Sequence, residues 1–262
     1  MFDRRGLFAI GVALVFAIGA VVYAGYLGSQ APRVGNSAAL PVRTLESPAV
    51  PTPSPSPSSL LSGKSIAFLG DGWAIGAGTN CGEPCGYADL AASQLEMKVN
   101  VDGIAGTGYS NGGGTSVPGP NPFSTRLTHF ESFKPDIAVL AGGQADAAFV
   151  QTNVQQAASA LMATLKQDMP ATRIVVLGPF APSGQPSAQL LSTRDSIQAA
   201  AKSTGLTFID PLAEQWITGT QGKVGSGNAP QYIAADGQNP TVDGHKYLAD
   251  RLVADLKQVG IV

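Results

Sequence analysis

The sequence predicts an α/β domain, a three-layer α/β/α sandwich with a five-stranded parallel sheet. Short apolar runs of strand length recur from Gly63 to the C-terminus, and Ala- and Gln-rich stretches separate them. Apolar residues recur at helical spacing in the separating stretches, which indicates amphipathic helices. Strands that alternate with helices form parallel sheets that are covered by helices on both faces.

The expected elements follow in chain order. The strands are the runs Ser65–Leu69, Val99–Asp102, Asp136–Leu140, Arg173–Leu177 and Leu206–Ile209. The main helices are the stretches Tyr87–Met97, Thr152–Asp168, Ser187–Ser203 and Val242–Val259. Ligands of such sheets bind beyond the carboxyl ends of the strands, so we expect function in the loops that follow each strand.

Composition narrows the class of protein further. The chain has 262 residues, of which 44% are hydrophobic and 13% charged, and its formal net charge is -2. This apolar fraction excludes global disorder, and the 32 glycines follow no triplet period, which excludes collagen. The charge balance offers no basic stripe for a phosphate backbone, so we expect no nucleic-acid partner.

The N-terminal residues predict a membrane anchor. No charged residue lies between Leu7 and Leu27, and a helix of that length crosses ~30 Å of hydrocarbon. Arg4 and Arg5 precede this run, so we expect a cytoplasmic N-terminus and a domain outside the cell membrane. The alternative is a cleaved signal peptide, whose apolar region usually has ~7–15 residues.

The chain therefore divides into three predicted parts. Residues 1–30 are a cytoplasmic tip and a single-pass transmembrane signal-anchor helix. Residues 31–62 are rich in Pro and Ser, which predicts an extended, disordered linker between membrane and domain. Residues 63–262 are the extracytoplasmic domain.

Four motifs follow the predicted strands or precede the last helix. They are GDG at 70–72, a glycine-rich segment that contains Gly106, GGQAD at 142–146, and DGQNP at 236–240. In order, spacing and strand context, residues 65–262 resemble the SGNH (GDSL) hydrolase family. The resemblance implies a flavodoxin-like fold and an esterase-like site, with no cofactor and no metal.

In that family a serine nucleophile, a histidine base, an aspartate that orients the histidine, and an oxyanion-hole glycine and asparagine perform the reaction. Matched by position, the serine falls on Gly72, the asparagine on Ala145 and the histidine on Asn239, while Asp236 keeps the aspartate. A glycine has no side-chain nucleophile, and a carboxamide does not accept a proton near neutral pH. The resemblance therefore implies a degenerate catalytic site.

The residues around those three positions still match the family pattern. The candidate ligand-binding residues are Asp71, Gly72, Trp73, Gly106, Gly143 and Asp146. The Trp73 ring either stacks on a sugar or acyl chain or packs in the core.

Three carboxylates lie in the motifs, at Asp71, Asp146 and Asp236. They could converge to do acid–base work or to bind a cation. We expect instead that Asp71 and Asp146 accept hydrogen bonds from loop amides and that Asp236 bonds the amide of Asn239.

Other residues could replace the missing catalytic groups. We expect His245 to be structural and His129 to be a half-buried surface residue. Ser110 and Thr79 lie in loops on the correct side of the sheet, but such residues usually make hydrogen bonds within turns.

Cys81 and Cys85 flank Gly-Glu-Pro in the loop after the first strand. In an extracytoplasmic domain with no other cysteine, they predict a disulfide beside the site. Two thiols alone are too few ligands for a zinc site.

Three hypotheses of function remain open. The first is a pseudoenzyme that binds an acylated cell-envelope glycan, or a protein partner, in the former substrate groove. The second is an active esterase, deacetylase or acyltransferase that uses another nucleophile. The third is a structural subunit of a membrane assembly.

Overall fold

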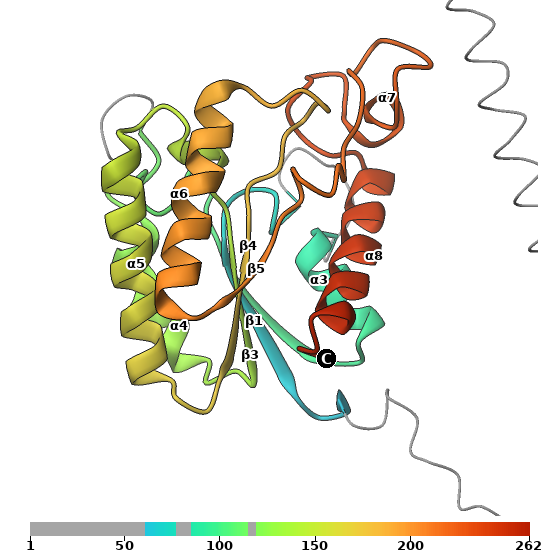
Figure 1. Cartoon of the computed structure of the whole chain (residues 1–262). Helices are drawn as coiled ribbons and strands as arrows, with labels where there is room; N and C mark the ends of the chain where they lie inside the picture. The colour runs from blue at the N-terminus through green and yellow to red at the C-terminus, as the bar shows by residue number, and fades with distance from the viewer. Residues whose placement is uncertain (1–60, 77–84, 115–118) are drawn as a thin grey trace, which may run out of the picture. The chain divides into compact units, whose positions relative to one another are not determined.

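The computed structural model describes residues 61–76, 85–114 and 119–262 (Figure 1). All of these residues belong to one compact unit, Ser54–Val262. The predicted membrane span, almost the whole predicted linker, Thr79 and Cys81 lie outside the described residues. Within the described ranges, no helix has both the length and the apolar character to cross a bilayer.

Five strands form the sheet: β1 Ser65–Gly70, β2 Lys98–Gly103, β3 Ile137–Ala141, β4 Arg173–Leu177 and β5 Thr207–Ile209. Their order across the sheet is β2-β1-β3-β4-β5, and every pair is parallel. The predicted parallel sheet is thus confirmed. In the sheet, β2 lies on one side of β1, and β3, β4 and β5 follow on its other side. The strand order therefore reverses between β1 and β3. This reversal opens a crevice at the carboxyl ends of the strands.

Helices cover both faces of the sheet (Figure 1). On one side lie α3 Tyr87–Gln94 and α8 Val242–Gln258, and on the other lie α4 Leu127–Ser132, α5 Gln151–Asp168 and α6 Ala188–Thr204. Three short helices complete the described part of the chain: η1 Phe123–Arg126, η2 Gln144–Asp146 and α7 Ala229–Tyr232. The predicted three-layer arrangement is therefore confirmed.

The central strands supply both cores. Ile66 and Phe68 of β1 pack in the core beneath α3 and α8, while Ala67 and Leu69 pack in the core beneath α5 and α6. Successive side chains of a strand point to opposite faces, so a strand covered on both faces is apolar at every position. This is why β1 reads as a continuous apolar run.

One predicted helix ends earlier than expected. Helix α3 stops at Gln94, although apolar residues continue to Met97. Glu96 adopts a left-handed backbone with φ 55°, and the Met97 N–H donates to the Ala92 carbonyl at 3.0 Å. The chain must turn there because β2 begins at Lys98. The reversal into the edge strand therefore overrides the helical pattern.

Side-chain caps set where α6 and α8 begin. Ser187 Oγ accepts from the Leu190 N–H at 3.1 Å, and Thr241 Oγ1 accepts from the Gly244 N–H at 2.9 Å. Each such cap stabilises a helix by about 1 kcal/mol. The two caps fix the segments just before α6 and α8 at the carboxyl edge of the sheet.

Candidate functional site

A cavity of about 450 Å³ lies at the carboxyl ends of the strands. We call it the site cavity. The loops after β1, β2, β3 and β4 and the segment before α8 line it, with Asp71, Gly72, Trp73, Ala105, Gly106, Gln144, Ala145, Ala147, Phe180, Pro182, Ser187, Leu190, Gln238 and Asn239. Its position matches the crevice that the strand order opens.

The structure brings the motif positions together. Gly72, Gly106, Ala145 and Asn239 all line the site cavity, although they come from four separate segments. Each follows an element that ends at the same edge of the sheet, or precedes α8 there. The arrangement holds no side-chain hydroxyl at 72, no carboxamide at 145 and no imidazole at 239.

Asp236 and Asn239 are joined by hydrogen bonds. One oxygen of Asp236 accepts from the N–H groups of Gln238 at 2.8 Å and Asn239 at 3.0 Å. Its second oxygen accepts from Asn239 Nδ2 at 2.8 Å. The backbone donors, that of Asn239 first, lower the pKa of Asp236 below its usual value. The expected Asp236–Asn239 bond is confirmed.

Asp71 joins two parts of the cavity wall. Its Oδ1 accepts from the Trp73 N–H and its Oδ2 from Gln144 Nε2, both at 2.9 Å. Burial raises the pKa of Asp71 to about 7, the effect of desolvation exceeding that of the backbone donors. The carboxyl therefore links the loop after β1 to the turn after β3.

Asp146 is fully buried and lies outside the cavity lining. It accepts from the N–H groups of Tyr109, Ser110 and Asn111, each at 2.9 Å. Burial nevertheless raises its pKa. A Cβ at Gly108 would lie 2.1 Å from its Oδ2, so this close approach requires glycine. As expected, Asp71 and Asp146 hold loop amides.

Gly143 also lies outside the cavity lining. Its φ is 122°, and a Cβ there would meet Ile197 Cδ1 at 2.6 Å. Its place in the motif thus reflects backbone conformation and close packing of the loop. Among the described residues, no group of three or more His, Cys, Asp or Glu side chains could hold a metal ion.

An aromatic pair forms one wall of the site cavity. The Trp73 and Phe180 rings stack with centroids 5.1 Å apart and an interplanar angle of 15°. Trp73 is only 7% exposed, so its ring belongs to the core and also lines the cavity. Sequence reasoning missed Phe180, although Gly178-Pro179-Phe180 follows β4 at the correct end of the sheet.

The comparisons with known proteins agree with this geometry. The model of the GDSL-like lipase/acylhydrolase family matches residues 68–247, which is more than half of the chain. The chain belongs to this family. A GDSL lipase of Mycobacterium tuberculosis is 24% identical over 197 residues, which cover 71% of this chain and 79% of that protein.

Solved structures share the fold of this domain at low sequence identity. A family two carbohydrate esterase from Clostridium thermocellum, solved with cellohexaose, is 18% identical with a TM-score of 0.57. The match covers 79% of this chain but 66% of that one, just under two thirds. An esterase from a Pseudoalteromonas species is 15% identical with a TM-score of 0.55, covering 74% of this chain and 97% of that one.

Neither histidine of this GDSL-family chain lines the site cavity. His245 is fully buried, and its ring stacks on Tyr87 with centroids 6.5 Å apart. Burial lowers the pKa of His245 to about 4, so the ring is neutral. Its structural role is as expected.

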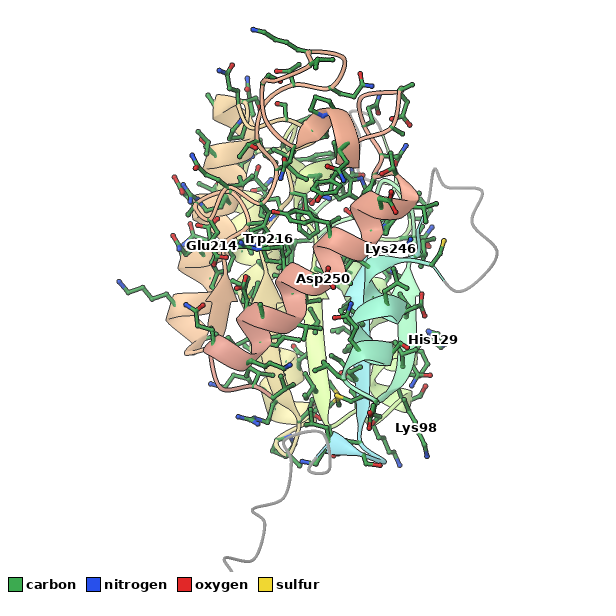
Figure 2. All side chains as sticks on the ribbon, turned by 90° about the vertical axis from the view of Figure 1, so that its right-hand side faces the viewer. Lys98, His129, Glu214, Trp216, Lys246 and Asp250 are labelled. Atoms are coloured by element: carbon green, nitrogen blue, oxygen red, sulfur yellow. The ribbon has the colours of Figure 1, made fainter. Side chains whose placement is uncertain are left out.

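His129 differs from the expectation, because its side chain is 68% exposed and not half-buried. Helix α4 directs the ring outward beside β2, opposite Glu214 and Trp216 in the view of Figure 2. Its Nδ1 lies 3.0 Å from Asp102 Oδ2.

The described residues supply no serine–histidine pair at the cavity. Ser187 is the one hydroxyl-bearing residue in the lining, and its Oγ caps α6. Ser110 lies outside the lining, where its N–H donates to Asp146. Within the described ranges no hydroxyl bonds the ring of either histidine. Thr79 and Cys81 lie outside the described residues, so their roles, including the disulfide with Cys85, stay predictions.

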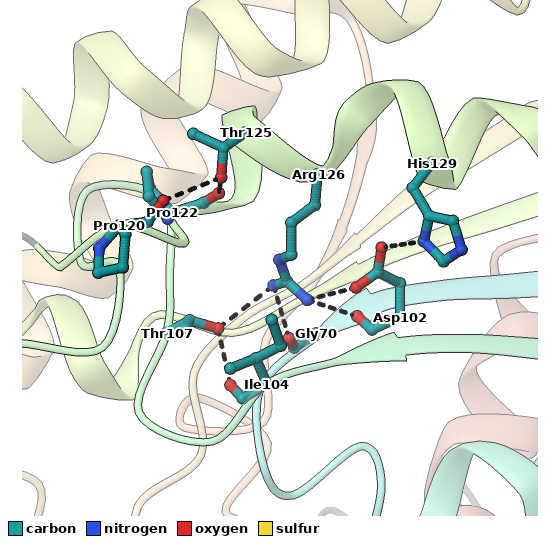
Figure 3. Close-up of polar contacts among 9 residues, drawn as sticks. All are labelled: Gly70, Asp102, Ile104, Thr107, Pro120, Pro122, Thr125, Arg126 and His129. Atoms are coloured by element: carbon teal, nitrogen blue, oxygen red, sulfur yellow. Dashed lines mark hydrogen bonds and ion pairs between the residues drawn. The ribbon is translucent and has the colours of Figure 1, made fainter.

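A buried arginine braces the loop that carries Gly106 (Figure 3). One terminal nitrogen of Arg126 bonds Asp102 Oδ1 at 2.6 Å, and the other bonds the Gly70 carbonyl at 2.9 Å and Thr107 Oγ1 at 3.2 Å. Removing one partner of a buried ion pair typically costs ~3–5 kcal/mol. Arg126 therefore ties the ends of β1 and β2 together, a role that its sequence context did not indicate.

Proposed function

We propose that this domain binds the acyl group of an acylated cell-envelope glycan in the site cavity and does not cleave it through a serine–histidine pair. One observation carries the proposal. Gly72, Ala145 and Asn239 surround an intact cavity of about 450 Å³ but provide none of the family's three reacting groups. In this proposal the cavity remains, while the three side chains that react in the family are replaced.

The missing groups are decisive for turnover. Loss of the nucleophile of a serine hydrolase costs on the order of a millionfold in kcat. Asn239 offers no substitute base, because its Nδ2 donates to Asp236 and its carbonyl is not basic near neutral pH.

The cavity suits an ester-bearing ligand. Trp73, Phe180 and Leu190 give it an apolar wall for an acyl chain. No hydrogen bond within the described part of the chain uses the N–H of Gly72 or Gly106. Backbone donors of this kind can bind a carbonyl oxygen without any catalytic side chain.

The relatives favour an acylated carbohydrate or lipid over other ester classes. One is named a GDSL lipase, and another is a carbohydrate esterase solved with cellohexaose. In this proposal residues 1–30 anchor the chain with its N-terminus in the cytoplasm, and residues 31–62 hold the domain in the envelope. The uncharged run Leu7–Leu27 after Arg4 and Arg5 supports this placement.

Calorimetry and NMR on the full-length chain in mild detergent test the proposal, with O-acetylated xylotetraose as probe. We expect measurable heat of binding and no release of acetate. Ala145→Leu should fill the cavity and weaken binding at least tenfold, whereas Ala254→Leu, on the exposed face of α8, should leave it unchanged.

Two outcomes would overturn the proposal. Labelling by a fluorophosphonate together with steady acetate release would identify an active esterase with another nucleophile. Absence of binding would remove the acylated glycan and favour a protein partner or a structural role.

A further inference from the structure

A second hollow, of about 560 Å³, lies near the site cavity. We call it the polar shelf. It is formed by Gly184 and Gln185 of the loop after β4 and by eight residues of the loop after β5: Gln215, Thr218, Gly219, Thr220, Lys223, Val224, Gly225 and Ser226. A connecting cavity of about 180 Å³ shares Phe180 with the site cavity and shares Gly184 and Gln215 with the polar shelf. The three hollows therefore follow one another along the carboxyl edge of the sheet.

Internal hydrogen bonds hold the shelf in shape. The Thr218 N–H donates to Asn228 Oδ1 at 2.7 Å, and Asn228 Nδ2 donates to the Trp216 carbonyl at 2.9 Å. The Gly184 N–H donates to the Gly219 carbonyl at 2.8 Å, which joins the two loops. A surface preformed in this way loses little conformational entropy when a ligand binds.

Four exposed polar side chains on the shelf make no hydrogen bond or ion pair within the described residues: Gln185, Gln215, Thr220 and Lys223. Among the described residues, no carboxylate lines the shelf. Two carboxamides and an ammonium group provide donors and acceptors that match a ligand rich in hydroxyl groups.

Gln215 adopts a conformation that disfavours its own side chain. Its φ is 53°, in the left-handed region, where a residue other than glycine costs roughly 1 kcal/mol. The same residue lines both the connecting cavity and the polar shelf. Such strain commonly occurs at ligand sites, where a side chain is needed despite its cost.

We infer that the polar shelf binds the sugar chain of a glycan and that Gln215 contacts it. The inference rests on the proposed function, because the shelf takes the carbohydrate of the same ligand whose acyl group enters the site cavity. The shelf also adds polar groups for sugar hydroxyls to those of Gln144, Gln238 and Asn239 in the mainly apolar site cavity.

Binding of unacylated sugars to the full-length chain tests the inference. The probes are xylohexaose, cellohexaose, maltohexaose and chitohexaose, measured by calorimetry. We expect at least one to bind. Gln215→Gly should weaken that binding at least tenfold while Tm stays the same or rises, since glycine relieves the backbone strain.

Lys134→Gly is the matched control, because Lys134 also has a left-handed φ, of 46°, and lies between α4 and β3 away from all three hollows. It should leave Kd unchanged. Lys223→Ala, a second shelf variant, should weaken binding as well.

The outcomes separate this inference from the proposed function. If none of the four hexasaccharides binds, or if Gln215→Gly and Lys223→Ala keep the parent Kd, the shelf is not a glycan site. Ala145→Leu should weaken binding of the acetylated probe at least tenfold and leave hexasaccharide binding intact. If only the site cavity fails to bind the acyl group, the acetylated probe therefore loses only the extra affinity that its acyl group would give.

Discussion

Replacing Asp71 by asparagine should remove a pH-dependent loss of stability. The carboxyl is 6% exposed, and burial raises its pKa from 3.8 to about 7. The folded protein therefore keeps this proton over a pH range in which the unfolded chain has released it. Because the folded state binds more protons in this range, the free energy of unfolding falls as pH rises from about 4 to about 7.

The size of this loss of stability is set by the difference between the pKa of Asp71 in the unfolded chain and its pKa in the folded protein. One pH unit corresponds to about 1.4 kcal/mol, so three units correspond to about 4 kcal/mol, as an order of magnitude. Asparagine is neutral at every pH. Its carbonyl can accept from the Trp73 N–H, and its amide can meet Gln144 Oε1, which is buried and has no partner in the described structure.

Urea unfolding of the full-length chain, followed by tryptophan fluorescence, measures the effect. Trp73 and Trp216 are the two tryptophans of the sequence, and both are buried. Asp71→Asn should stabilise the protein, relative to the parent, by about 3 kcal/mol more at pH 8 than at pH 4.5, because part of the penalty is already present at pH 4.5. Asp255, whose pKa burial raises to about 6, affects both proteins equally and cancels in the difference.

The same stabilisation at pH 8 and pH 4.5 would refute this reasoning. It would mean that Asp71 titrates alike in the folded and unfolded chain, so that burial imposes no charge penalty at this position.

Two further predictions concern the family motifs. The triple variant Gly72→Ser, Ala145→Asn, Asn239→His should gain hydrolysis of acetyl esters, measured with p-nitrophenyl acetate; a folded but inactive variant would contradict the positional match. Gly108→Ala would place a methyl group 2.1 Å from a buried carboxylate oxygen and should cost about 3 kcal/mol in urea unfolding, the upper end of the usual cost of overpacking. Gly106→Ala, whose added Cβ meets nothing within 4 Å but keeps φ 73°, should cost about 1 kcal/mol; equal costs would contradict the packing argument.

Local pattern was enough to predict most of the sheet. The apolar runs Ser65–Leu69 and Asp136–Leu140 predicted two strands, which the structure places at Ser65–Gly70 and Ile137–Ala141. The runs are continuous because both faces of those strands are covered. The same logic failed at Met97, where the start of β2 overrides an apolar spacing that would otherwise continue the helix.

The motif positions could be predicted because they follow strands. Parallel strands end at one edge, so Gly72 and Ala145 had to lie near each other once their strands were known. The exposure of His129 could not be predicted, because it depends on how α4 is oriented beside the edge strand.

The sequence by itself thus determined the fold class, the loops that form the site and the identity of the residues in the four motifs. These features follow from residue identity, hydrophobic period and order along the chain. Only the tertiary structure decided that Phe180 stacks on Trp73, that Arg126 braces the loop of Gly106, and that Gln215 lies between two hollows. The physical reason is that these contacts join loops whose relative positions are set by packing across the sheet and by no local pattern.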